Sequence, residues 1–120
     1  MEIRRINNIG VAIVDPGEKI TSVNNMLDIM AKAWMENCGA LIVREESLGK
    51  DFFDLKTGYA GELLQKISNY RMKMAIVGDF SKYTSKSMLA LIYESNRGKQ
   101  VFFTGSVGEA LDIIGKSTGG

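Results

Sequence analysis

Apolar positions along the chain recur at two spacings, which predict alternating helices and strands. The clearest helical spacing is in residues 59–69, where one face carries Tyr59, Ala60, Leu63, Leu64 and Ile67. Residues 72–77 follow at once and are almost wholly apolar, which is typical of a parallel strand that is covered on both faces. This stretch therefore predicts an amphipathic helix followed by a buried strand, and the remaining segments frame it.

The N-terminal segment predicts a hairpin, a helix and a second buried strand. Residues 3–7 and 10–14 are alternating or apolar and are separated by two asparagines, a pattern that indicates a β-hairpin. Apolar residues at helical spacing then run from about Ser22 to Gly39, where the glycine is expected to end the first helix. Residues 40–43 are a short apolar run that predicts a strand, and the charged residues after it predict a loop.

The C-terminal segment predicts two helices around a last strand. Residues 88–98 have apolar positions at helical spacing and end in a glycine, and residues 101–104 predict the strand. Ser106 and Glu109 match a capping box, in which each side chain can bond the other residue's backbone amide, so they predict the start of a fourth helix. We expect residues 116–120 to be a frayed tail.

The order of these segments predicts the fold class. Strands that are separated by single helices pair in parallel through right-handed crossovers, whereas the two strands of a hairpin are antiparallel. A chain of 120 residues is long enough to bury one core. We therefore expect a single α/β domain over residues 1–120, with a mostly parallel five-stranded sheet, one antiparallel edge strand and about four helices.

Composition excludes several classes of function. The net charge is +1, from 15 basic and 14 acidic residues, so the chain lacks the excess positive charge that nucleic-acid binding usually requires. It contains no histidine and only one cysteine, which excludes an internal disulfide and any nucleophile that depends on a histidine of the same chain. The same counts remove zinc sites that are built from several cysteines or from histidines. We assign no catalytic residue, no metal ligand and no cofactor.

No segment predicts secretion or a membrane span. The N-terminal residues MEIRRI lack the apolar run of a signal peptide, and no segment reaches the roughly 20 apolar residues that cross a bilayer. The low cysteine content suits a reducing compartment. We therefore expect a cytoplasmic protein that binds neither membranes nor nucleic acids.

Three runs carry a resemblance to a known family. FFDLKTGYAGELLQKISNY, MKMAIVGDFSKY and YESNRGKQVFFTGSVGEAL resemble the bacterial DUF family 4180, a small family without an assigned activity. The resemblance covers nearly the whole chain. It implies a bacterial protein, but it does not imply a reaction.

At a more remote level, the predicted layout is similar to STAS domains, the fold of anti-sigma-factor antagonists. In that family a strand ends in a short turn like Asp-Ser-Ser-Gly, and the next helix recognises a partner. Residues 54–58 occupy the corresponding place, and the last strand and helix are also similar. The chain departs from the pattern, because Thr57 stands where those regulators carry a phosphorylatable serine, Lys56 precedes it, and the turn is one residue longer. The resemblance implies a STAS-like regulatory module.

In an open sheet of this kind, ligands bind beyond the carboxyl ends of the strands, where loops and helix N-termini converge. We expect this edge to carry a turn that contains Asp54, Lys56, Thr57 and Gly58, and the strand-end residues Asp15, Glu45, Asp79 and Ser106. The amides that open the central helix could bind an anion, or a phosphate on Thr57. The simpler interpretation is that Thr57 only caps this helix.

Two further groups have both a functional and a structural interpretation. Strand-end carboxylates, with Asp15, Asp54 and Asp79 as candidates, could bind Mg²⁺, or could serve only as caps and turn residues. The polar face of the central helix and the residue after it could dock a protein, or could be a solvated face with one weak ion pair. That group consists of Glu62, Gln65, Lys66, Asn69 and Tyr70.

Other residues have mainly structural interpretations. Glu94 and Arg97 could form an acid and an anion clamp, but they also suit the end of a helix. We expect Trp34 and the seven methionines to fill the core. We expect Cys38 to be buried and unreactive.

The preferred hypothesis is a regulatory or protein-interaction module, which docks an unidentified protein partner through the central helix and the turn at residues 54–58. One alternative is a small-molecule or Mg²⁺-assisted phosphate-handling enzyme, in which Asp54 or Asp79 is a metal ligand or base. Another alternative is a homodimer without a ligand.

Overall fold

The computed structural model describes residues 1–118, and in this part of the chain five strands and five helices follow one another. The strands are β1 (Glu2–Ile6), β2 (Ile9–Ile13), β3 (Cys38–Arg44), β4 (Lys73–Val77) and β5 (Val101–Thr104). The helices are α1 (Val23–Met35), α2 (Glu45–Phe53), α3 (Tyr59–Asn69), α4 (Lys86–Arg97) and α5 (Val107–Ser117), and a short 3-10 turn, η1 (Leu55–Thr57), precedes α3.

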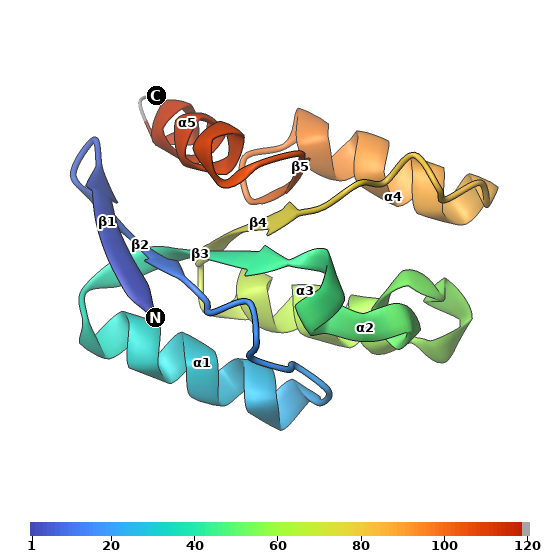
Figure 1. The fold of residues 1–120 in the computed structure, drawn as a ribbon, viewed down its shortest axis with the longest axis horizontal. Helices are drawn as coiled ribbons and strands as arrows, with labels where there is room; N and C mark the ends of the chain where they lie inside the picture. Colours follow the sequence, from blue (N-terminus) through green and yellow to red (C-terminus); the bar gives the residue numbers. More distant parts are fainter. Residues whose placement is uncertain (119–120) are drawn as a thin grey trace.

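The strands form one sheet in the order β1-β2-β3-β4-β5 (Figure 1). β1 is antiparallel to β2, whereas β2, β3, β4 and β5 are parallel to their neighbours. This arrangement confirms the predicted α/β fold, with a mostly parallel sheet and an antiparallel edge strand. The carboxyl ends of β2 to β5 therefore meet at one edge of the sheet, which we call the carboxyl edge, and their starts meet at the amino edge.

The hairpin of β1 and β2 turns at two asparagines. Asn7 and Asn8 have φ angles of 49° and 71°, the left-handed conformation that tight hairpin turns require and that asparagine adopts more readily than most residues. The Asn7 side chain also donates to the Gly115 carbonyl at 3.2 Å. This hydrogen bond ties the turn of the hairpin to α5.

The helices cover the two faces of the sheet unequally. α1, α2, α3 and α4 pack on one face, around buried residues such as Met26, Leu63 and Met88. Among the described helices, α5 alone covers the opposite face, through Ala110 and Ile114 (Figure 1). The parallel strands follow one another in the sheet in the same order as in the chain. Right-handed crossovers between them therefore place all connecting helices on the same face. Only the helix after the last strand can turn to the other face.

The prediction of a charged loop after β3 is wrong, because the structure has a helix there. α2 brings the described helices to five instead of about four. Only two of its buried residues, Leu48 and Phe52, are apolar, and Gly49, with a φ of 74°, interrupts it. Glu45 and Glu46 nevertheless suit the start of a helix, since carboxylates are stabilised at the positive end of its dipole.

The first helix also ends earlier than predicted. α1 stops at Met35, and Asn37, with a φ of 62°, makes the turn that was expected at Gly39. Gly39 lies within β3 instead. Asparagine tolerates the left-handed conformation, so this helix ends without a glycine.

The expectation that Trp34 and all methionines fill the core is wrong in part. Five of the seven methionines are buried, but Met1 and Met35 are 40% and 77% exposed, and Trp34 is 72% exposed. Cys38 is buried as expected. Burial, partly offset by the charge of Arg5, raises the pKa of its thiol, which disfavours a reactive thiolate.

The C-terminal helix is longer than predicted. α5 continues to Ser117 and Thr118 is its C-cap, so the described part of the expected tail at residues 116–120 belongs to the end of a helix, and residues 119 and 120 lie outside the described residues. None of the helices in residues 1–118 is long and apolar enough to cross a membrane.

Candidate functional site

The four strand-end candidates lie at the carboxyl edge of the sheet, where Asp15, Glu45, Asp79 and Ser106 follow β2, β3, β4 and β5. They have separate partners. Asp15 is exposed and pairs with the N-terminal ammonium at 3.1 Å. The Ser106 hydroxyl accepts from the Glu109 amide at 3.1 Å, as the N-cap of α5. Among the described residues, only Glu45 and Asp79 of these four are joined by a hydrogen bond.

The turn at residues 54–58 lies between α2 and α3, and Asp54, Lys56, Thr57 and Gly58 are all exposed. α3 runs back toward the start of β4, so its own start lies on the side of the carboxyl edge. The Tyr59 hydroxyl donates to the Ile20 carbonyl at 2.7 Å. The turn is therefore held beside the segment that leaves β2.

The side chains of this turn are bonded to nearby backbone groups. The Asp54 carboxylate accepts from the Lys56 amide at 3.3 Å. The Thr57 hydroxyl lies 2.8 Å from the Asp51 carbonyl and 2.9 Å from the Asp54 carbonyl, to which it can donate, and it accepts from the Tyr59 amide at 3.2 Å. Thr57 is not the cap that the simpler interpretation expected, because the N-cap of α3 is Gly58 and it has no side-chain cap bond. The contacts of Thr57 are instead local bonds from a side chain to nearby backbone groups, which hold the turn in shape.

The predicted docking residues on α3 are mostly accessible. Glu62, Gln65 and Asn69 are exposed, and Gln65 donates to Asn69 at 2.9 Å. Lys66 is half-buried, and within residues 1–118 it forms no ion pair with Glu62. Tyr70, just past the end of the helix, is 63% exposed.

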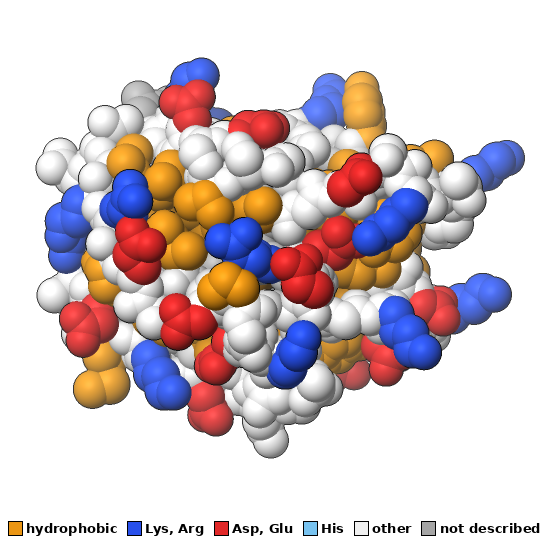
Figure 2. Space-filling model, in the orientation of Figure 1, with side chains coloured by type: hydrophobic (Ala, Val, Ile, Leu, Met, Phe, Trp, Pro, Cys, Tyr) orange, Lys and Arg blue, Asp and Glu red, His pale blue; other side chains and the backbone are white. Residues whose placement is uncertain are grey.

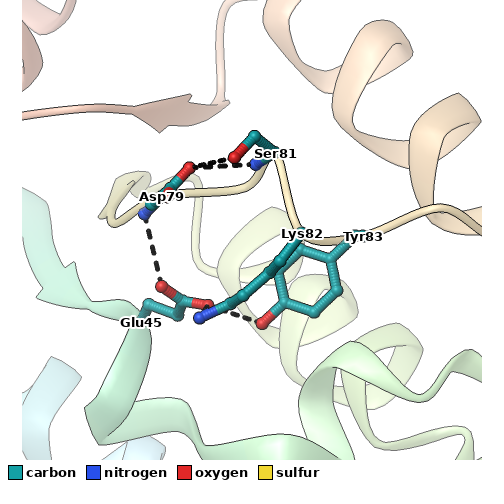
Figure 3. A network of polar contacts seen from close by, with 5 residues as sticks. All are labelled: Glu45, Asp79, Ser81, Lys82 and Tyr83. Atoms are coloured by element: carbon teal, nitrogen blue, oxygen red, sulfur yellow. Dashed lines mark hydrogen bonds and ion pairs between the residues drawn. The ribbon is translucent and has the colours of Figure 1, made fainter.

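The best-defined polar cluster at the carboxyl edge is centred on Glu45, which is only 8% exposed (Figure 3). Its carboxylate accepts from the Tyr83 hydroxyl at 2.5 Å and from the Asp79 amide at 3.3 Å, and it pairs with the Lys82 ammonium at 2.6 Å. Asp79 in turn accepts from the hydroxyl and the amide of Ser81, at 2.6 and 3.1 Å. We call these five residues the Glu45 cluster. It fixes the loop between β4 and α4 against the start of α2.

The contacts within the Glu45 cluster set its protonation states. Burial alone would raise the pKa of Glu45, but hydrogen bonds from Lys82 and Tyr83, the charge of Lys82 and the Asp79 amide together lower it. Burial and the Glu45 carboxylate raise the pKa of the Tyr83 hydroxyl, and the hydrogen bond to Glu45 raises the pKa of Lys82. At neutral pH these three residues are therefore a carboxylate, a neutral phenol and an ammonium that satisfy one another.

Close packing surrounds this cluster. A Cβ atom at Gly78 would lie 2.6 Å from both Cβ and Oε1 of Glu45, so any larger residue there would displace the Glu45 side chain. The Tyr83 ring stacks on Phe53 with centroids 4.8 Å apart. An open hollow of about 240 Å³ lies beside Glu45, Phe53 and Tyr83.

The carboxylates proposed for Mg²⁺ do not form a ligand set. In the part of the chain that the structure describes, no three side chains of Asp, Glu or Cys lie close enough to hold a metal ion. Asp15, Asp54 and Asp79 each bond to their own local partner instead. Hydrogen bonds from Ser81 lower the pKa of Asp79, as expected for a turn residue.

An apolar surface lies at the opposite, amino edge, where α1 and α3 end. Trp34, Met35 and Tyr70 are 72%, 77% and 63% exposed. A hollow of about 430 Å³ opens beside them, and it is lined by Leu27, Met30, Ala31, Trp34, Tyr70 and Met72. We call these six residues together with Met35 the α1–α3 apolar surface.

Charged side chains are scattered over the face of the molecule in Figure 2. Basic and acidic groups alternate there, without a large area of one sign. This distribution agrees with the net charge of +1. The face drawn in Figure 2 thus lacks the continuous positive potential that phosphate backbones require.

Over residues 6–114 the chain matches a known protein family, described as Domain of unknown function (DUF4180). The chain belongs to the DUF4180 family. No curated protein and no solved structure matches it. The matched residues contain both the Glu45 cluster and the α1–α3 apolar surface, so both belong to the DUF4180 domain.

Sequence reasoning missed the apolar surface of this DUF4180 domain because its spacing is that of a core face. Leu27, Ala31 and Trp34 recur at helical spacing, but the sheet covers the neighbouring side of α1. The signal in the sequence is that the apolar stripe of α1 is wider than a single core face. Ile29 extends this stripe on one side and Met35 extends it on the other. Of the predicted docking residues, only Tyr70 belongs to this surface.

The acid and anion clamp considered at the end of α4 is absent from the described residues of the DUF4180 domain. The Arg97 guanidinium lies over the Tyr93 ring, 5.4 Å from its centroid. Asn96 bonds to the amide and the carbonyl of Phe103, at 2.7 and 3.3 Å. Glu94 is exposed, so these residues serve the end of the helix.

Proposed function

We propose that this DUF4180 domain is a protein-interaction module that docks through the α1–α3 apolar surface. Exposure of Trp34, at 72%, is the main support for this proposal. A contiguous exposed apolar surface on a globular domain typically marks an interaction site. Tryptophan and tyrosine are also enriched among the residues that dominate binding energy.

The shape of the surface supports the same function. Its floor is buried, since Met30 and Met72 are 4% and 3% exposed, whereas Trp34 and Tyr70 project beside it. A partner side chain in the hollow would therefore lie between two aromatic rings and away from water, as interface hot spots do. The polar residues of α3 adjoin Tyr70 and would form the rim of such an interface.

We extend this proposal to a regulatory role because the sequence resembles STAS domains remotely, although the turn at residues 54–58 follows the helix α2 and not a strand. The turn at residues 54–58 would then receive an input at the start of α3, and the end of α3 adjoins the docking surface. Exposure of Lys56 and Thr57 supports access to this turn. A phosphate on Thr57 would replace the donor that bonds the Asp51 and Asp54 carbonyls and would add about two negative charges.

Site-specific photo-crosslinking tests the docking surface. Benzoylphenylalanine replaces Trp34 in one variant and Leu89 in a matched control, because Leu89 is also an apolar helix residue, 49% exposed, on α4. After irradiation in cells of the native host, the variant at position 34 should form discrete crosslinked species that the control does not form. Equal crosslinking at both positions, or none at position 34, would contradict the proposal. Mass spectrometry then identifies the crosslinked chain.

A further inference from the structure

We propose that the occupant of the α1–α3 apolar surface is a second copy of this chain, with the two α1 helices packed antiparallel. This inference rests on the proposed function and adds the identity of the partner. It follows from the shape of the surface and from the charges beside it.

A projection and a hollow lie next to each other on the same helix. Met35, at the end of α1, is 77% exposed, whereas the hollow is lined by Leu27 and Ala31, one to two turns earlier. In a two-fold symmetric dimer a surface meets itself, so that a contact from residue i to residue j is made twice. An axis perpendicular to α1 near Ala31 brings Met35 of each copy against Leu27 of the other, and the small Ala31 side chain lets the helices approach.

The charges beside the surface are also self-complementary. Asp28 and Lys32 are exposed, lie one turn apart on the same flank of α1, and take part in no ion pair among the described residues. Two antiparallel helices related by a two-fold axis bring the same flank of each copy together. Asp28 of each copy then faces Lys32 of the other, which forms two ion pairs of opposite charge.

A second copy satisfies this surface better than a single helix of another protein. Such a helix would fill the hollow, but the projecting Met35 would need a further hollow in that partner. Asp28 would repel a strongly acidic partner, and Lys32 would repel a strongly basic partner. Figure 1 shows that the side of α1 turned away from the sheet has no other element over it, so a second α1 can reach it.

Charge reversal followed by mixing tests the arrangement. Asp28→Lys and Lys32→Glu each place two pairs of like charges across the axis, and each should raise the dimer dissociation constant about tenfold or more. When the two variants are mixed, every pair has opposite charges again, so a heterodimer should form with about wild-type affinity. Native mass spectrometry separates the three dimers by mass, and circular dichroism checks that each variant is folded. The mixture is an internal control, because it contains the same two chains.

A wild-type dimer that weakens in both variants and recovers in their mixture supports the inference. A wild-type chain that stays monomeric, while position 34 crosslinks to a different protein, overturns the inference and leaves the proposed function standing. A dimer that neither substitution affects has its interface elsewhere and also overturns it. Absence of any crosslink at position 34 removes both proposals.

Discussion

Glu45 shows how a charged side chain is stabilised in a nearly buried position. An isolated carboxylate is costly to bury, and the cost is offset only when its oxygens are hydrogen-bonded and its charge is paired. Here the phenol of Tyr83, the amide of Asp79 and the ammonium of Lys82 meet both requirements. The Lys82 side chain is 58% exposed, so water weakens its ion pair, and the Tyr83 hydroxyl makes the shorter and more buried contact.

We predict that Glu45→Gln lowers the free energy of unfolding by about 1–2 kcal/mol near neutral pH, because an amide cannot pair with the Lys82 ammonium. The folded state lowers the pKa of Glu45, so its contribution is fully present above the unfolded pKa of about 4.3 and is lost as the pH falls through the folded pKa. Urea denaturation of both proteins near pH 7 and near pH 3 measures this loss. The exposed neighbour provides the control Glu46→Gln, which should change stability by less than about 0.5 kcal/mol. A pH-independent difference for Glu45→Gln would contradict the assignment.

Two glycines should respond in opposite directions to the same substitution. Gly78→Ala should lower stability by about 2 kcal/mol or more, since overpacking displaces the Glu45 carboxylate, which lies 2.6 Å from the added Cβ. Gly61→Ala, within α3, should raise stability by about 0.5–1 kcal/mol, because an added Cβ there meets no atom within 4 Å. Thermal unfolding measures both changes. Stabilisation by Gly78→Ala would show that Glu45 does not pack against the end of β4.

At the scale of elements, the parallel strands could be predicted because each is a short apolar run between helical patterns. β4 and β5 are the clearest cases, since nearly all of their residues are buried. α2 could not be predicted in the same way. Its buried apolar positions, Leu48 and Phe52, are only one turn apart and stand among charged residues, and Gly49 breaks the pattern between them.

The candidate site could be predicted only as far as strand order determines it. Parallel strands bring Glu45 and Asp79 to one edge, and this follows from the sequence pattern. The contact from Tyr83 to Glu45 spans 38 positions in the chain and depends on how the loop after β4 folds back, for which no local pattern exists. The exposure of Trp34 likewise depends on how much of α1 the sheet covers.

Ser106 was predicted both as a strand-edge candidate and as a helix cap, and these roles can be separated. Ser106→Ala should lower the free energy of unfolding by about 1 kcal/mol, because the hydroxyl that accepts from the Glu109 amide is lost. Ser106→Asn should keep most of the stability, since asparagine caps helices about as well as serine. Chemical denaturation measures both variants. Equal stability of Ser106→Ala and wild type would contradict a capping role.

At the scale of the whole molecule, the two edges of the sheet differ in character. The carboxyl edge carries a polar cluster whose groups satisfy one another, whereas the amino edge exposes two aromatic rings and a methionine to water. Covering apolar area is favourable in water, and the polar cluster offers no comparable gain. Association through the amino edge would also leave the carboxyl edge and the turn at residues 54–58 free to bind something else.

Fluorescence of Trp34 tests the account most directly, because it is the only tryptophan in the chain. As the protein concentration rises through the dimer dissociation constant, the emission should shift to shorter wavelength and acrylamide should quench it less, since the indole moves from water into apolar contact. The Lys32→Glu variant should show the same shift only at higher concentration. Emission of a solvated indole at every concentration, in samples where light scattering detects a dimer, would contradict the account.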